Sequence, residues 1–443
     1  MKKVILFLFL ILLGSSARAE KLIEEGATLT LDQCVDIAIK NHPSVVAQDN
    51  ALKASSSRIG EVSSAFWPQL NFDASYTRTK PLNQPVTTTF GTPTPLNPTG
   101  ITTTQADKDK SYNLYAMSFN AQQLIFDFGK TMYQTKIAEY NRDASGANLN
   151  NTVSQIAFAV KQAYYAALQA KRNQEVIQES VDNAQKHLDQ AKGFFEVGTR
   201  AKFDVTNAEV LLSNNKLQLI QAQNAYRIAL VTLNNTMGMP EAPAYTIEDN
   251  LEYQKYEITF DDALKKAYGN RPDLIAVMDQ EKAARKSVDV ATVGYLPYLT
   301  ANAQYQWQGS DFRLPDEWSV GAAFVWPIFN GFLTQNQINE SKYNLNTAKA
   351  NENLIRQGVL LDVQQSFLNL SAAEEAIPAA QLVVKQAADN LDLANGRYAA
   401  GVGNPVEITD AELAYNNAKV NENQALYNYK IAQASLQKAM GEK

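Results

Sequence analysis

The side chains that could carry acid–base, nucleophilic or metal chemistry are few in this chain of 443 residues. It has two histidines, His42 and His187, and a single cysteine, Cys34. The histidines lie far apart in sequence, and neither has a partner at the spacing of metal ligands. The sequence contains no matching set of serine, histidine and aspartate and no glycine-rich phosphate loop. It therefore predicts a protein that is not an enzyme and that uses no metal and no cofactor.

Ionisable residues instead gather beside two short turns that contain glycine. Asp204 follows the turn at Gly198, and Glu407 follows the turn at Gly401. Glycine readily adopts the left-handed backbone conformation that ends many helices, and a carboxylate is favoured in the first turn of the next helix. Helix capping alone would therefore explain both acids.

Each of these turns ends a helical pattern of unusual length. The first pattern runs without proline from about Lys130 to Lys192, which amounts to roughly 95 Å of α-helix. Its small apolar residues recur at intervals of three and four and form one narrow seam: Val153, Ile156, Val160, Ala163, Ala167 and Ala170. Such a seam favours close packing of helices, while the remaining Asn- and Gln-rich faces stay wet. We expect two antiparallel helix hairpins whose tips are the two glycine turns.

Before each long helix the sequence alternates between apolar and polar residues, which predicts strands with one apolar and one polar face. The apolar positions of the first pair of segments are Leu70, Phe72, Ala74 and Tyr76, within residues 64–77, and Tyr115, Met117, Phe119 and Ala121. Those of the second pair are Leu299, Ala301, Ala303, Tyr305 and Trp307, and Trp318, Val320, Ala322, Phe324 and Trp326. Segments of about 9–11 residues with aromatic residues near their ends are typical of strands that cross a membrane. The edge of a periplasmic β-sandwich is the alternative.

The same order of helix, strand pair and long helix occurs twice in the chain. Thr30–Asp32 of the first copy recurs as Thr259–Asp261, and Tyr140, after the first strand pair, recurs as Tyr343. The offset between the copies is smaller after the strand pair than before it, so the first copy has extra length in its strand pair. There the loop at 79–111 is rich in threonine and proline; we expect it to be irregular and exposed, and its role stays open. A tandem repeat of this kind indicates two similar units that pack side by side.

The repeat divides the chain into four parts. Residues 1–19 have a basic start, an apolar run and the cleavage motif Ala17-Arg18-Ala19, which together predict a signal peptide for export. Residues 20–238 form the first repeat, 239–257 an acidic irregular connector, and 258–441 the second repeat. Each repeat is expected to contain a helix, a β-hairpin, a long helix and a further helix.

The composition narrows the class of the exported chain. After the signal no apolar run reaches the roughly 20 residues of a membrane helix. The net charge of −6, which becomes three units more negative without the two lysines and one arginine of the signal, argues against nucleic acid as a partner. Cys34 cannot form a disulfide within the chain, and we expect it to be a small buried residue.

Several motifs carry a resemblance to a known family. The strand ends read LIFDFG at Leu124–Gly129 and PIFNG at Pro327–Gly331, and the tips read FFEVGTRAKFDVTNAE and RYAAGVGNPVEITDAE. With the duplicated order of elements, these motifs resemble the TolC family of outer-membrane efflux proteins over essentially the whole exported chain. The resemblance implies an α+β membrane protein: a homotrimer with four strands per chain in one 12-stranded β-barrel, continued by a long α-helical coiled-coil tunnel. Three chains would also remove the open sheet edges, which lipid does not tolerate.

The resemblance also implies roles for residues at the tips. Glu407 and Asp410 match an acidic ring that forms a gate at the periplasmic end of the tunnel. Asp204 and Tyr398 match a tether between the helix hairpins. Carboxylates gathered around a threefold axis repel one another unless they are paired or solvated, so such a ring favours cations.

This chain departs from the family pattern at two tip positions. Gly403 stands where the compared family member has an arginine, and Phe203 replaces a threonine. Arg200 and Lys202 lie close to the acids and are alternative ion-pair donors. Whether they latch one chain to the next stays open.

The outer ends of the tips have a second implied role. Gly198, Thr199, Gly401 and Val402 resemble positions that contact the helical hairpin of a periplasmic adaptor, also called a membrane fusion protein. Small residues permit close packing of helix tips. The same glycines also serve as ordinary helix caps.

The function that the resemblance implies is export across the outer membrane of a Gram-negative-type bacterium. The chain would be the passive exit duct of a tripartite efflux or type I secretion system, served by an inner-membrane pump of RND, ABC or MFS type. The cargo and the pump stay open, with small-molecule efflux as the default. The alternative is a structural or adhesive periplasmic coiled-coil protein without a pore.

Overall fold

A computed structural model of the protein describes residues 23–80, 87–90, 101–104 and 111–442. The expected signal peptide lies outside the described residues, as does much of the loop at 79–111. The chain divides into two compact units. The first comprises the described residues within Met1–Ala51, Gly146–Ala276 and Asn353–Lys443, and the second those within Leu52–Ser145 and Val277–Glu352.

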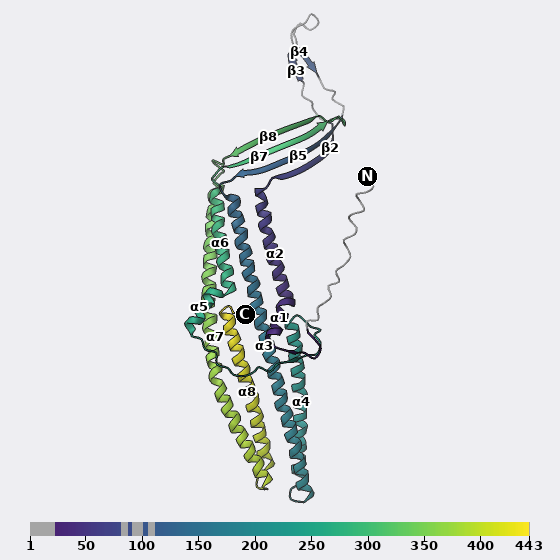
Figure 1. Ribbon diagram of the computed structural model, residues 1–443, viewed down its shortest axis with the longest axis vertical. Helices are drawn as coiled ribbons and strands as arrows, with labels where there is room; N and C mark the ends of the chain where they lie inside the picture. The colour runs from purple at the N-terminus through teal and green to yellow at the C-terminus, as the bar shows by residue number, and fades with distance from the viewer. Residues whose placement is uncertain (1–22, 81–86, 91–100, 105–110, 443) are drawn as a thin grey trace. The chain divides into compact units, whose positions relative to one another are not determined.

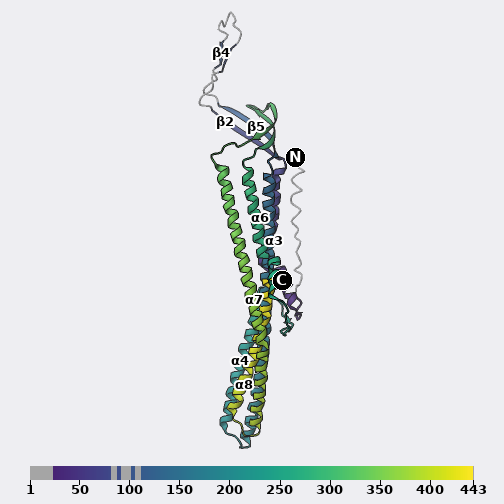
Figure 2. The same ribbon diagram turned by 90° about the vertical axis from the view of Figure 1, so that its left-hand side faces the viewer.

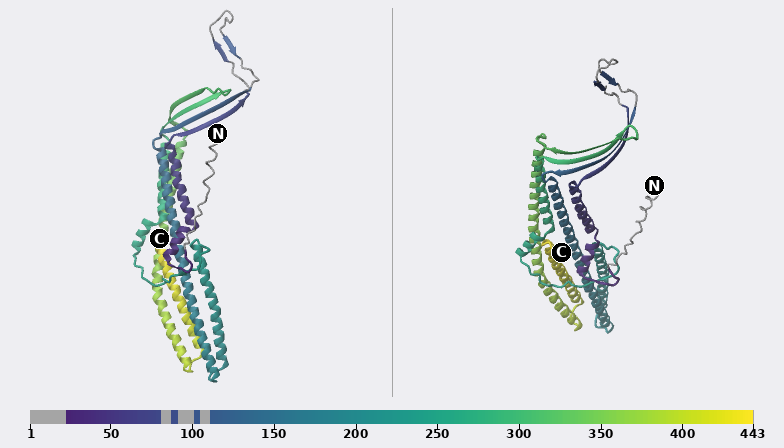
Figure 3. Two further views of the ribbon diagram at one scale, coloured as in Figure 1. Left: turned by 45° about the vertical axis from the view of Figure 1, so that its right-hand side comes forward. Right: turned by 45° about the horizontal axis from the view of Figure 1, so that its top comes forward.

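The second unit contains an antiparallel sheet of four strands. These are β2 (Gln69–Thr79), β5 (Tyr112–Phe126), β7 (Tyr298–Gly309) and β8 (Asp316–Val325), in the order β2-β5-β7-β8. Both expected strand pairs are confirmed, and β5 and β7 join them into one sheet. Figure 3 shows the strands lying side by side in a curved sheet.

The sheet has the two unlike faces that the alternation predicts. On one face Phe72 lies against Phe119, with their ring centroids 4.8 Å apart. On the other face the Asn120 amide donates to the Asp73 carboxylate at 2.8 Å. Large apolar side chains of the first face are exposed in the single chain, so this face lacks a covering element within the described residues.

Two strand expectations are corrected by the structure. The segment 64–77 does not begin as a strand, because Ser64–Phe66 forms a 3-10 turn after helix α2 (Pro43–Ser63) and strand β2 begins only after Pro68. Proline restricts the residue before it to an extended conformation and so separates the two elements. The loop at 79–111 is not wholly irregular, because β3 (Thr87–Phe90) pairs with β4 (Ile101–Thr104).

The motifs LIFDFG and PIFNG form the turns from strand to long helix. Phe128 and Gly129 have positive φ angles of 53° and 85°, and the Asp127 carboxylate accepts from the Thr131 backbone N–H at 2.7 Å. In the second half, Asn330 contacts Thr334, with its side-chain amide 2.6 Å from the threonine hydroxyl. Each motif therefore supplies a side chain that supports the start of the following helix.

The helices of the two halves follow the same order and have closely matched lengths (Figure 1). The first half has α1 (Leu31–Asn41), α2, α3 (Lys130–Glu196) and α4 (Lys202–Thr236), and the second has α5 (Phe260–Asn270), α6 (Pro272–Val293), α7 (Leu333–Ala399) and α8 (Pro405–Ala439). Helices α3 and α7 have 67 residues each, and α4 and α8 have 35 each. Helix α3 thus ends slightly later than the expected Lys192. None of the helices in the described part of the chain is both long enough and apolar enough to cross a membrane.

The connector between the halves is tied to the first unit. Its strand β6 (Thr246–Ile247) pairs in parallel with β1 (Thr28–Leu29), so the expectation of a wholly irregular connector is wrong at this point. The buried Tyr164 hydroxyl of α3 donates to the Glu248 carbonyl at 2.7 Å. Cys34 is fully buried in α1, as expected.

Within the first unit, α4 packs along α3 and α8 along α7, which Figures 1 and 2 show from two sides. Helix α8 also contacts α3 through a row of polar pairs: Lys419–Glu179, Asn423–Asn173, Gln424–Gln169 and Gln437–Lys161, at 2.7–3.1 Å. Helix α4 instead exposes a row of large apolar side chains: Val210, Leu217, Ile220, Ile228 and Val231. One of the two corresponding helices is therefore enclosed by the chain, and the other is not.

Candidate functional site

The two helix tips have the same backbone structure. Gly198 and Gly401 have φ angles of 76° and 80°, which only glycine adopts without strain. In both tips the next backbone N–H, of Thr199 or Val402, donates to the carbonyl five residues earlier, at 2.9 and 3.1 Å. These bonds are those of a Schellman helix end. We call residues 194–204 the first tip and residues 397–407 the second tip.

The outer ends of both tips are open to solvent. A Cβ atom at Gly198 or Gly401 would meet nothing within 4 Å, and Val402 is exposed. Val197 and Phe203 of the first tip are exposed as well. The sequence reasoning did not assign these two residues to the contact surface, although large apolar side chains beside a glycine turn are a visible signal of one.

Arg200 connects the two tips. Its Nη2 donates to the Gly403 carbonyl at 3.1 Å, and its guanidinium carbon lies 5.1 Å from the centroid of the Tyr398 ring. Its Nη1 is 4.0 Å from the Asp204 carboxylate. Both charged side chains are largely buried, so this cluster is better shielded from water than a surface ion pair.

Asp204 and Tyr398, the two residues of the expected tether, lie next to each other. Their exposed fractions are 9% and 3%, and together with His187 and Thr409 they line a cavity of about 30 Å³. No hydrogen bond joins Asp204 to Tyr398 among the contacts of the described residues, although the cavity is large enough for a bridging water molecule.

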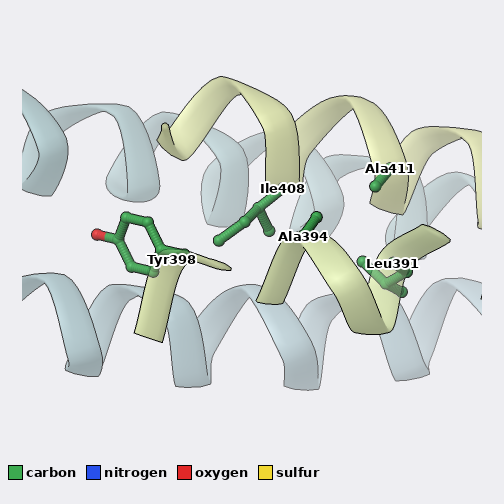
Figure 4. Packing of buried hydrophobic residues seen from close by; sticks show 5 residues of the cluster. All are labelled: Leu391, Ala394, Tyr398, Ile408 and Ala411. Atoms are coloured by element: carbon green, nitrogen blue, oxygen red, sulfur yellow. The ribbon is translucent and has the colours of Figure 1, made fainter. Parts of the chain in front are cut away.

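The Tyr398 side chain is packed as well as polar. Figure 4 shows it at one end of a buried cluster between α7 and α8 that also contains Ile408, Ala394, Ala411 and Leu391. Burial raises the pKa of Tyr398, the negative charge of Asp204 raises it further, and the positive charge of Arg200 opposes them. The phenol is therefore neutral at ordinary pH and can donate a hydrogen bond.

The expected acidic ring residues are solvent-exposed on α8. The Glu407 carboxylate accepts from the Arg397 guanidinium at 3.1 Å, within the second tip, and Asp410 lies one turn further along. An exposed pair of this kind contributes only about 0–1 kcal/mol. The Asn404 side chain caps α8 by accepting from the Val406 N–H at 3.0 Å. Sequence reasoning missed Arg397 and Asn404, although Asn before Pro is a recognisable helix start.

Lys202 is the last of the expected site residues. Lys202 is exposed at the start of α4, and the contacts described for this chain include no ion pair for it. Nor do the described residues contain a group of three or more His, Cys, Asp or Glu side chains arranged to hold a metal ion.

The sequence did not lead us to one buried acid, Glu412. Glu412 on α8 is only 3% exposed, and neither of its carboxylate oxygens has a hydrogen-bond partner among the described residues. Burial raises the pKa of this carboxyl group to about 7. Its position one turn after Ile408 places it on the buried face of α8, which the helical spacing could have revealed.

Comparison with known proteins identifies related chains. The family model described as "Outer membrane efflux protein" matches residues 34–239 and 263–442. The outer membrane protein TolC of Escherichia coli strain K12 is 26% identical over 346 residues, which cover 74% of this chain and 70% of TolC. The alkaline protease secretion protein AprF of Pseudomonas aeruginosa is 22% identical over 347 residues, covering 76% and 72% of the two chains. The pyoverdine export outer membrane protein OpmQ of the same species is 23% identical over 287 residues, covering 62% and 58%.

Solved structures share the fold. The CmeC outer membrane channel of Campylobacter jejuni matches with a TM-score of 0.73 and 20% identity, covering 93% of this chain and 85% of CmeC. The outer membrane protein VceC of Vibrio cholerae matches with a TM-score of 0.75 and 18% identity, covering 93% and 96%. At these identities the likeness establishes the fold and leaves cargo and partners undefined.

Proposed function

This chain belongs to the outer membrane efflux protein family, and from that premise we propose that it works as a homotrimer gated at its helix tips. The protein is an exit duct of the outer membrane and periplasm, of the kind that serves tripartite efflux or type I secretion. The observation that carries the trimer is the exposure of apolar faces on α4 and α7, whose counterparts on α8 and α3 are mostly covered within the chain.

The sheet supports three copies for a simple reason. Among the described residues, strands β2 and β8 form the two unpaired edges of the sheet, and its apolar side chains, such as Phe72 and Trp318, are exposed. Pairing β8 of one chain with β2 of the next would remove both edges. Three sheets of four strands then make one closed 12-stranded barrel with its apolar face toward lipid.

The helices support the same arrangement through the internal repeat, which matches α3 and α4 with α7 and α8 position by position. The polar contacts between α8 and α3 within the chain correspond to contacts between α4 of one chain and α7 of another. Asn423–Asn173 corresponds to Ile220–Ala376, and Lys419–Glu179 corresponds to Lys216–Leu382. Ile220 and Leu382 are 63% and 55% exposed in the single chain. The proposed contact between chains therefore replaces the polar pair Asn423–Asn173 with the apolar pair Ile220–Ala376 and adds the apolar side chain of Leu382.

A second set of contacts leads to the same pairing of copies. Within the second unit, the Lys282 ammonium lies 5.9 Å from the centroid of the Tyr140 ring. The internal repeat matches this pair with Lys53 and Tyr343, and Tyr343 is 71% exposed. Lys53 of one chain would thus lie over Tyr343 of the next, which is a favourable cation–π contact.

The energy of covering these residues is large enough to hold the assembly. Each large aliphatic side chain taken from water is worth roughly 1.5–3 kcal/mol, and α4 exposes five of them. The interface joins unlike faces, α4 to α7, so it repeats from chain to chain until the ring closes.

The tips are the proposed gate and adaptor site. Three copies would gather Glu407 and Asp410 around one axis, where their charges repel and attract cations. The exposed backbone at Gly198, Thr199, Gly401 and Val402 would receive the helical hairpin of a periplasmic adaptor, which links the duct to an inner-membrane pump of RND, ABC or MFS type. The cargo would be small molecules by default or proteins, and the names of related proteins include both pyoverdine export and protease secretion.

Planar-bilayer recording of the purified protein tests this function. We expect a trimer by light scattering and a small cation-selective current. Neutralising the acidic ring by Glu407→Gln with Asp410→Asn should lower the cation selectivity. A current with unchanged selectivity would keep the duct and remove these acids from the gate. A soluble periplasmic rod without current would instead favour the structural coiled-coil alternative.

A further inference from the structure

The two halves of the chain differ at the contact that joins their tips. We call the contact between the first and second tips of one chain the intrachain junction; it consists of Arg200, Asp204, Tyr398 and the Gly403 carbonyl. In the proposed trimer, the second tip of one chain also meets the first tip of the next. We call this contact the interchain junction, and its members are the residues that the internal repeat matches with those of the intrachain junction.

The interchain junction lacks the group that connects the tips within a chain. Arg200 is matched by Gly403 in the second half, so the bridging guanidinium has no counterpart. Tyr398 is matched by Phe195 in the first half, which has a ring but no hydroxyl. The matched positions therefore supply no counterpart of the Arg200 cation, of its hydrogen bond or of its contact with the tyrosine ring.

The remaining charged group of the interchain junction is already engaged. Glu407 is the counterpart of Asp204, and its carboxylate accepts from Arg397 within its own tip at 3.1 Å. This pair is about half exposed, whereas Arg200 and Asp204 are largely buried. In the single chain the second tip therefore has only an exposed ion pair where the intrachain junction has the buried Arg200 guanidinium.

The backbone prevents recovery of an arginine at the corresponding position. A Cβ atom at Gly403 would lie 2.7 Å from the Tyr398 nitrogen and 2.9 Å from the Arg397 carbonyl carbon. Contacts this short require the backbone to move. The shape of the second tip thus excludes a side chain like that of Arg200 at Gly403.

We propose that the periplasmic end opens at the three interchain junctions, while Arg200 keeps the two tips of each chain together as one moving unit. This inference rests on the proposed trimer and adds which contacts separate. Further from the tips, the apolar contact of Ile220 with the next chain's α7 keeps the copies associated. Opening is then a local parting of tips and does not dissociate the trimer.

Matched cysteine pairs test which junction moves. His187 and Thr409 line one cavity within the chain, and the internal repeat matches them with Asn390 and Thr206, which would meet between chains. The pairs His187→Cys with Thr409→Cys, and Asn390→Cys with Thr206→Cys, are bridged with a short bis-maleimide in a Cys34→Ala background. Neither pair alters the junction residues or the acidic ring.

The expected result is a clear asymmetry in single-channel openings of the trimer. The interchain bridge should reduce large openings about tenfold or more, and the intrachain bridge should leave them nearly unchanged. Equal suppression by both bridges, or by neither, would overturn the inference. If the trimer itself is wrong, the Asn390 and Thr206 pair will give no covalent trimer on a denaturing gel, which distinguishes the two failures.

Arg200→Gln provides a second measurement that needs no cross-link. Losing a charge-assisted hydrogen bond should raise the open fraction about tenfold, because the two tips of a chain then separate as well. Arg397→Gln is the matched control and should change the open fraction far less. An Arg200→Gln channel identical to the wild type would contradict the role assigned to Arg200.

Discussion

Helices α4 and α8 have the same length and follow the same kind of turn, yet the rest of the chain covers α8 more fully than α4. Helix α8 packs against both α7 and α3, and its contacts with α3 are polar pairs such as Asn423–Asn173. Helix α4 packs mainly against α3, meets α8 only near the tips, and exposes apolar residues such as Ile220. The difference teaches that the two halves share a backbone plan but differ in the side chains that corresponding helix faces carry. In the proposed trimer, the α8 face meets its own chain and the α4 face meets a second copy.

The largest expected effect comes from charging the exposed face of α4. In the proposed trimer, Ile220→Glu places a carboxylate opposite Ala376 of the next chain, so the interface loses apolar burial and gains an unpaired charge. We expect loss of the trimer in light scattering and on semi-native gels. The matched control is Asn423→Glu, the corresponding change within the chain, which should lower the unfolding temperature while the protein that remains folded is trimeric. A stable Ile220→Glu trimer would break the comparison.

The buried acid of α8 predicts a pH effect. An ordinary glutamate has a pKa near 4.5, and the folded protein holds Glu412 protonated up to about pH 7. Below pH 4.5 the carboxyl group is neutral in both the folded and the unfolded protein, so the cost of burying a charged carboxylate is absent there. The free energy of unfolding should fall as pH rises from 4.5 to 7 and then level off, by up to about 3 kcal/mol. Glu412→Gln should remove this loss in denaturant titrations at pH 5 and pH 8.

The corresponding acid on α4 sharpens that test. Glu209 occupies the position of Glu412 in the first half and is exposed in the single chain. If α4 is covered by a second copy as α8 is covered by its own chain, Glu209→Gln should also stabilise the trimer at pH 8. If only Glu412→Gln increases stability, the surroundings of α4 in the trimer differ from those of α8 more than the sequence relationship implies.

A smaller effect is expected at the tips. Asp204→Ala combined with Tyr398→Phe removes the acid beside Arg200 and the buried hydroxyl, so the periplasmic end should loosen and single-channel conductance should rise severalfold. The fold should be unchanged, because the Tyr398 ring still fills its place beside Ile408. Unchanged conductance would mean that Arg200 and the Gly403 carbonyl form the whole latch.

The smallest expected effect concerns the pair at Tyr343. Tyr343→Leu removes the proposed cation–π contact with Lys53 of the next chain, worth about 0.5–1 kcal/mol at an exposed site. Tyr140→Leu removes the corresponding contact with Lys282 within the chain. We expect only Tyr343→Leu to make the trimer's melting temperature depend more strongly on protein concentration. Equal concentration dependence in both variants would argue against this pairing of chains.

The sequence by itself determined the elements and their order. Alternation over Gln69–Thr79 and the three-and-four spacing in α3 depend on backbone geometry that is the same wherever the element lies, so the strands and helices could be predicted. The glycine turns at Gly198 and Gly401 were equally readable, because the left-handed conformation excludes most other residues. The motif resemblance then led to the family and to the residues of the tips.

Only the tertiary structure decided which side chains meet. The bond from Arg200 to Gly403 joins residues of different halves of the chain, and the isolation of the Glu412 carboxylate depends on what packs around one position of α8. Neither follows from local pattern, because a helix has several faces and the sequence does not state which neighbour covers each. The pairing of Thr87–Phe90 with Ile101–Thr104 was missed for the same reason: ladder hydrogen bonds depend on a partner strand, and composition alone describes only the loop's polarity.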